Sequence, residues 1–169
     1  MKILLFILIF ILSLYSDIIV AKSISHRAKV NDIKIIDGKV FSVADDATIK
    51  VWDKDLNLLK TIYLKEKFFN SNLYTLCFDK NNIFVAGTYG FDNPILVFDR
   101  ATLKLKKAIK NNFYTINKIK SNGKYICAVG SDYLYVFDKN LNFLYKHEFA
   151  KFNKTYSMIY DIVFLVCFC

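Results

Sequence analysis

The sequence predicts an all-β fold of repeated four-stranded antiparallel units, and three observations support this. The chain has the same type of ending three times, at Lys50–Asp53 (KVWD), Leu96–Asp99 (LVFD) and Tyr135–Asp138 (YVFD), spaced 46 and 39 residues apart. Each ending follows a similar succession of apolar segments and polar turns. Side chains in Thr48–Val51 alternate with the period of two that a half-buried strand requires, and no helical stripe competes outside the N-terminus.

Each repeat is expected to run strand, polar turn, strand, polar turn, strand, with a fourth strand after the Asp. The expected turns are Asp45–Ala47, Asp79–Asn82, Tyr89–Pro94, Lys120–Gly123 and Ser131–Asp132. The expected fourth strands are Leu58–Leu64, Leu103–Ile109 and Asn142–Phe149. Repeats of this length and pattern are typical of propeller blades.

We therefore predict an incomplete β-propeller of three blades at about 26–64, 70–109 and 113–149, with a partial fourth at 154–169. A closed propeller has typically 4–8 blades, so both ends of this arc are expected to be open. A shortened product of a longer gene would explain this, and such a chain is not expected to behave as a folded, functional monomer.

The first repeat also resembles a WD-repeat protein in four spaced polar residues, and the weaker likeness extends over roughly residues 26–149. His26 lies four residues before Val30, Ser42 is in the second strand, and Asp46 is six residues before Trp52. The resemblance implies hydrogen bonds from acid to imidazole, from imidazole to hydroxyl, and from indole N–H to hydroxyl. His26, Ser42, Asp46 and Trp52 are thus predicted to form a structural network.

The same residue types invite a hydrolase interpretation, but the chain has no nucleophile-elbow motif. We predict no catalytic residues, no cofactor and no metal site. The other repeats depart from the pattern: Phe98 and Phe137 replace the Trp, Phe69 stands where a His is expected, and the third repeat has Asp132 only five residues before its aromatic. Packing must then hold those blades together.

Residues 1–21 are interpreted as a signal peptide that begins with a hydrophobic helix. Met1-Lys2 is a short basic start, Ile3–Tyr15 is almost continuously apolar, and Ala21 gives a small residue before the cut. The unbroken run is shorter than the ~20 residues of a spanning helix, although an uncleaved anchor is the alternative. The mature domain, 22–169, is expected in the periplasm without membrane contact.

Four cysteines form no C-x-x-C motif. Cys77 and Cys127 have apolar and aromatic neighbours and are interpreted as small buried hydrophobic residues. Cys167 and Cys169 would share one face of a strand, and metal binding by that pair alone is not expected.

The net charge of +9 comes from lysines spread through turns and strand exteriors. This favours solvated blade edges over a nucleic-acid surface, and it is compatible with an acidic protein partner or an anionic cell-surface component. The leading hypothesis is an exported protein-interaction or assembly module. Export, blade pattern and composition are similar to those of the accessory L proteins of periplasmic nitrate reductase, which implies a reductase partner. The alternative is a propeller enzyme, hydrolase or quinoprotein, whose site forms only in a longer parent protein.

Overall fold

The computed structural model describes residues 25–64, 71–88, 93–110, 115–130 and 133–148, which form three four-stranded antiparallel sheets. The first blade comprises β1 (Val30–Ile36), β2 (Lys39–Ala44), β3 (Thr48–Trp52) and β4 (Leu58–Tyr63). The second comprises β5 (Asn72–Phe78), β6 (Asn82–Thr88), β7 (Ile95–Asp99) and β8 (Leu105–Ile109). The third comprises β9 (Lys118–Ser121), β10 (Tyr125–Gly130), β11 (Tyr133–Asp138) and β12 (Phe143–Glu148). The prediction of an all-β fold is confirmed.

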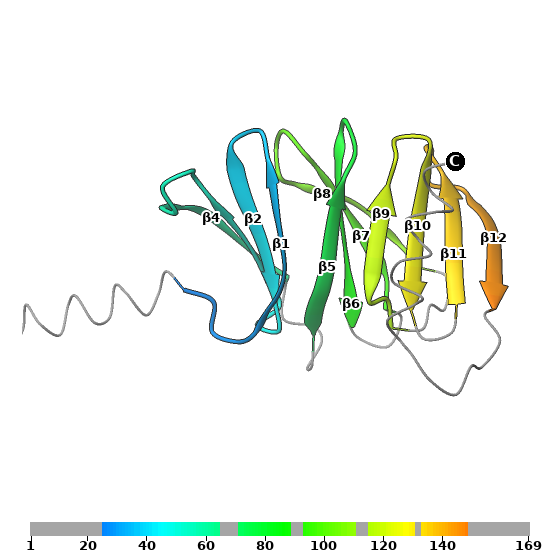
Figure 1. The fold of residues 1–169 in the computed structure, drawn as a ribbon, viewed down its shortest axis with the longest axis horizontal. Helices are drawn as coiled ribbons and strands as arrows, with labels where there is room; N and C mark the ends of the chain where they lie inside the picture. Colours follow the sequence, from blue (N-terminus) through cyan, green and yellow to red (C-terminus); the bar gives the residue numbers. More distant parts are fainter. Residues whose placement is uncertain (1–24, 65–70, 89–92, 111–114, 131–132, 149–169) are drawn as a thin grey trace, which may run out of the picture.

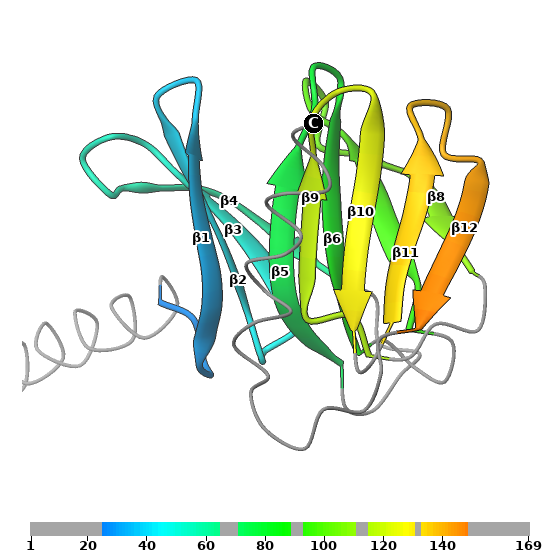
Figure 2. The ribbon, with the colours of Figure 1, turned by 45° about the vertical axis from the view of Figure 1, so that its right-hand side comes forward.

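The three blades stand side by side in chain order (Figures 1 and 2). Within each sheet the strands follow one another in chain order, as in a meander. The third strand of every blade pairs with the fourth across a register shift, just before the repeated Asp. The three units therefore share not only their strand order but also the position of this irregularity.

Each sheet buries both faces of its second and third strands, which explains their near-continuous apolar sequences. We call the side of a blade that faces the next blade in the chain its forward face, and the opposite side its rear face. The forward face of the first blade packs on the rear face of the second. This cluster contains Phe41, Val43, Ile49, Val51, Leu73, Leu76, Ile83, Val85, Leu96 and Phe98.

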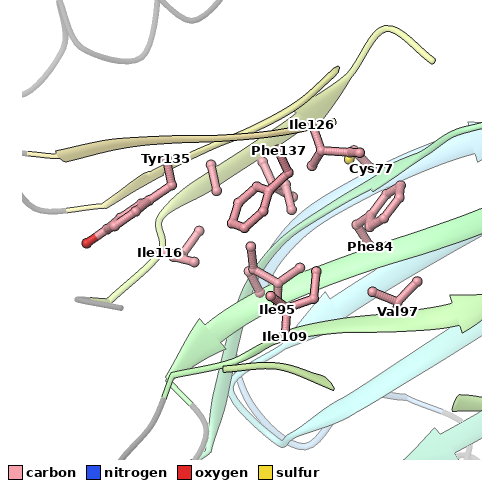
Figure 3. Close-up of a cluster of buried hydrophobic side chains, with 12 residues drawn as sticks. Cys77, Phe84, Ile95, Val97, Ile109, Ile116, Ile126, Tyr135 and Phe137 are labelled. Atoms are coloured by element: carbon pink, nitrogen blue, oxygen red, sulfur yellow. The ribbon is translucent and has the colours of Figure 1, made fainter. Parts of the chain in front are cut away.

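The second and third blades meet in the same manner. Figure 3 shows Phe84, Ile95 and Val97 of the second blade opposite Ile126 and Phe137 of the third. Tyr135 and Phe137 lie at the centre of the third blade and are almost inaccessible to solvent. The core of the described structure therefore lies between blades rather than within one.

Cys77 and Cys127 occupy neighbouring blades but differ in chemistry. Cys77 is a free, buried thiol within the core between the second and third blades, and burial raises its pKa. Cys127 is also buried, as expected, but it is disulfide-bonded, which the sequence did not predict. Apolar neighbours in the sequence do not distinguish the two states, because the state depends on whether a second sulfur comes within reach.

Several sequence predictions lie outside the described residues. These are the signal peptide with its hydrophobic helix, the partial fourth blade at 154–169 and the turns at 89–92 and 131–132. In the part of the chain that the structure describes, no helix is long and apolar enough to cross a membrane.

Candidate functional site

The four polar residues predicted for the first repeat lie together against its second and third strands. The Nδ1 atom of His26 is 3.0 Å from Oδ2 of Asp46, and its Nε2 atom is 2.7 Å from the hydroxyl of Ser42. The indole N–H of Trp52 donates to the same hydroxyl over 2.9 Å. With Nδ1 protonated, each donor finds one acceptor: Nδ1–H on Asp46, Ser42 O–H on Nε2 and Trp52 N–H on Ser42.

Asp46 accepts several of the hydrogen bonds in this network. Besides His26, its carboxylate accepts the backbone N–H groups of Arg27 and Thr48 at 2.8 and 3.1 Å and the hydroxyl of Thr48 at 2.7 Å. Burial alone raises the pKa of Asp46, but the hydrogen bonds from Thr48, Arg27 and His26 outweigh it and hold the pKa below its ordinary value. The carboxylate thus joins the segment before β1 to the turn between β2 and β3.

The arrangement of Ser42, His26 and Asp46 has the residue types of a nucleophile, a base and an orienting acid. Ser42 is buried. Its hydroxyl oxygen accepts a hydrogen bond from the indole N–H of Trp52, and its O–H group donates one to Nε2 of His26. A nucleophile must present its oxygen to a substrate carbonyl, and here a second donor already occupies that oxygen. The chemistry that this geometry supports is hydrogen bonding within the blade.

Lys50 lies beside this network in β3, almost fully buried. Its ammonium group donates to the hydroxyl of Thr61 at 3.1 Å. Desolvation lowers the pKa of Lys50, and the charge of Asp46 opposes that shift. The rear face of the first blade therefore contains a buried cation close to the partly buried carboxylate of Asp46.

The equivalent positions of the other blades are apolar. The strand register aligns Ser42, Lys50 and Trp52 with Val85, Leu96 and Phe98 of the second blade and with Ala128, Tyr135 and Phe137 of the third. Thr88 is described, and its hydroxyl accepts the backbone N–H of Asn72 at 3.3 Å. Phe69 and Asp132, which the sequence comparison of repeats singled out, lie outside the described residues.

A chain of polar contacts across the innermost strands was not predicted from the sequence. Asp32 of β1 accepts the hydroxyl of Thr75 at 3.2 Å and the backbone N–H of Leu76 at 3.1 Å. The hydroxyl of Thr75, itself fully buried, accepts the backbone N–H of Ile119 in β9 at 3.3 Å. Each inner strand is thereby fixed to the next, and only the alignment of neighbouring blades reveals it.

The sequence analysis also missed the role of the Asp that closes each repeat. Asp53, Asp99 and Asp138 each accept backbone N–H groups from the turn that follows, at 2.8–2.9 Å. Hydrogen bonds from Asn57, Thr102 and Asn142, respectively, lower the pKa of these carboxyl groups. An Asp followed three residues later by Leu-Asn, in the first and third repeats, was the available signal, since Asp favours such turns.

Comparison with solved structures places this geometry among known folds. The structure of U3-55K matches with a TM-score of 0.66 at 11% identity, over 75% of this chain and 41% of that one. The WD40 β-propeller domain of Doa1 matches with a TM-score of 0.61 at 21% identity, over 73% and 42%. The Neurospora crassa Pan2 WD40 domain matches with a TM-score of 0.58 at 16% identity, over 70% and 36%.

The fold is that of WD40 propeller blades. Identities of this size establish the fold alone, and the chain spans about two-fifths of the length of each of these structures. No protein-family model matches the sequence. Among the described residues of the three blades, no group of three or more His, Cys, Asp or Glu side chains is placed to hold a metal ion.

Proposed function

We propose that this chain is an exported propeller module that binds a protein partner and carries out no catalysis of its own. The propeller scaffold and the internal use of the Ser42, His26 and Asp46 side chains support this proposal. The single observation that carries it is the outer strand of the third blade, β12, whose six residues are all exposed.

Three of these exposed residues are consecutive and apolar. Phe143, Leu144 and Tyr145 are 44%, 45% and 48% accessible, and β12 is an edge strand of its sheet. The matched residues of the second blade, Leu105, Lys106 and Lys107, include two cations. Lysines on an edge strand prevent pairing with other chains, whereas an apolar edge invites an added strand or an apolar protein surface. The third blade therefore offers the contact surface.

Site-specific photo-crosslinking in the full chain tests this proposal. A photoreactive amino acid at position 144 should give one discrete adduct with a second protein in cells. The same probe at Lys106, the matched position of the second blade, should give none. Equal adducts at both positions, or none at position 144, would contradict the proposal.

The narrower proposal of an accessory role for periplasmic nitrate reductase rests on the sequence resemblance alone. It predicts that the adduct formed at position 144 contains a reductase subunit. Export has its own measurement, because mass spectrometry of the purified chain should find an N-terminus after Ala21.

The enzyme alternative has a separate test. A fluorophosphonate probe labels serines that are activated by a neighbouring histidine. We expect no labelling of Ser42 in the folded chain, because Trp52 and His26 occupy its hydroxyl. Labelling that is lost in Ser42→Ala, or bound calcium or a quinone absorbance band in the purified parent protein, would favour the enzyme.

A further inference from the structure

The forward face of the third blade is buried although no described strand lies on it. Cys127, Val129, Leu134 and Val136 form a separate apolar cluster in which each residue is only 2–4% accessible. They alternate with Ile126, Ala128, Tyr135 and Phe137, which contact the second blade, so they point to the opposite side. The described strands do not account for this burial, so the residues that cover the face are sought outside the described ranges.

The disulfide of Cys127 indicates which residues these are. The sequence contains four cysteines, and Cys77 is a free thiol. Cys127 is disulfide-bonded, which leaves Cys167 and Cys169 as the available partners within the chain. Both belong to the segment that follows β12.

The chemistry and length of that segment fit the face. Residues 155–169 read TYSMIYDIVFLVCFC, with one charged side chain, so they match an apolar surface. Cys127 lies in β10, two strands from β12 and hence roughly 10 Å away. The 19 residues from Glu148 to Cys167 can reach about 60 Å when extended, so this length is sufficient for a return to the face.

We propose that residues 149–169 cover the forward face of the third blade as a cap, fixed by a disulfide between Cys127 and one of Cys167 and Cys169. The bond forms when the two thiols pass two protons and two electrons to an acceptor disulfide, which leaves as two thiols. A disulfide-based oxidant of this kind acts in exported proteins, so the cap also requires an oxidising compartment. It protects one end of the blade stack from other chains.

Peptide mapping of the full chain tests the connection. After thiols are blocked under denaturing conditions, trypsin should separate the cysteines into peptides 68–80, 125–139 and 155–169. We expect 125–139 linked to 155–169 and an alkylated Cys77. An internal bond within 155–169 beside an alkylated Cys127, or Cys127 linked to Cys77 or to a second copy of itself, would overturn the proposal.

Reduction tests the cap as a structural element. A reducing agent should lower the melting temperature of the wild-type chain by roughly 5–10 °C and raise the fluorescence of a dye that binds apolar surface. Cys127→Ser should start at the lower value and show no response to reduction. Cys77→Ala, a control variant at the free thiol of the second blade, should keep the full response. An unchanged wild-type melt on reduction would contradict the cap, and the peptide map decides the connection even if a variant fails to fold.

Discussion

The first and second blades have the same strand order, but the side chains on their rear faces are stabilised in different ways. At three matched positions on the rear face, the first blade has Ser42, Lys50 and Trp52, and the second has Val85, Leu96 and Phe98. The apolar set is covered by the first blade, whereas the polar set is tied to His26 and Asp46.

The consequence is visible in the neighbouring inner strands. Ile33 and Ile35 of β1 are 55% and 75% accessible, while Leu76, the counterpart of Ile33, is fully buried. A face covered by another sheet gains stability from apolar area, but a face without such a cover must satisfy its polar groups itself. Hydrogen bonds therefore replace packing where no described blade is adjacent.

The largest expected effect concerns Gly87 in the second blade, whose backbone lies very close to that of Asn72 and Leu73. In Gly87→Ala the new Cβ would lie 2.0 Å from the carbonyl oxygen of Asn72 and 2.9 Å from Cα of Leu73. Both are backbone atoms that cannot rotate away, so we expect a loss of about 3 kcal/mol or more in the free energy of unfolding. Urea titration followed by tryptophan fluorescence measures it.

The first blade provides the control, because Ala44 has the matched register position. Ala44→Gly should cost only about 0.5–1 kcal/mol, since it adds backbone freedom without relieving a clash. If both substitutions lower the free energy of unfolding by the same amount, the two blades do not differ in how closely their backbones pack at this position.

The second prediction concerns the hydrogen-bond network of the first blade. Asp46→Ala removes the acceptor for His26, Arg27 and Thr48 and should cost about 2–3 kcal/mol. Trp52→Phe keeps a six-membered aromatic ring and removes one donor, so it should cost about 1 kcal/mol. Unfolding free energies of the two variants decide this, and equal or reversed costs would mean that Asp46 is solvated.

The sequence was sufficient for the strands but not for the contacts between blades. The repeated endings and period-two alternation gave the three meanders, because these signals are local in the chain. Asp32 and Thr75 carried no local signal, since their partners lie 43 and 44 residues further along the chain. The disulfide of Cys127 was not predicted for the same reason: it depends on a cysteine distant in the sequence.

The third prediction concerns how the stability of the fold changes at acidic pH. A carboxyl group whose pKa is lower in the folded than in the unfolded chain stabilises the fold above the unfolded value and loses that contribution as pH falls through the folded one. Asp46 has such a lowered pKa, so the stability gap between the wild-type chain and Asp46→Asn should be constant near pH 5 and shrink below about pH 4.

Asp53, Asp99 and Asp138 also have lowered pKa values, but they are present in both proteins and cancel in this difference. Urea titrations from pH 5 to pH 2 measure the gap. A gap that widens on acidification would show that Asp46 is not held as a carboxylate.

The smallest expected effect is a gain in stability. Leu56 follows the repeated Asp of the first blade, is exposed, and has a φ of 63°. Leucine is strained in this left-handed conformation, and asparagine tolerates it, so Leu56→Asn should stabilise the fold by about 0.5–1 kcal/mol. Leu59→Asn, an exposed position within β4, should give no gain, and thermal melts compare the two.

The polar contacts between inner strands allow hydrogen exchange to distinguish two motions: separation of strands within one sheet, and separation of one blade from the next. Most amides of a sheet exchange with deuterium when neighbouring strands come apart. The amides of Leu76 and Ile119 instead donate to side chains of the preceding blade. Their exchange rates therefore measure how often one blade moves away from the next, even while both sheets stay intact.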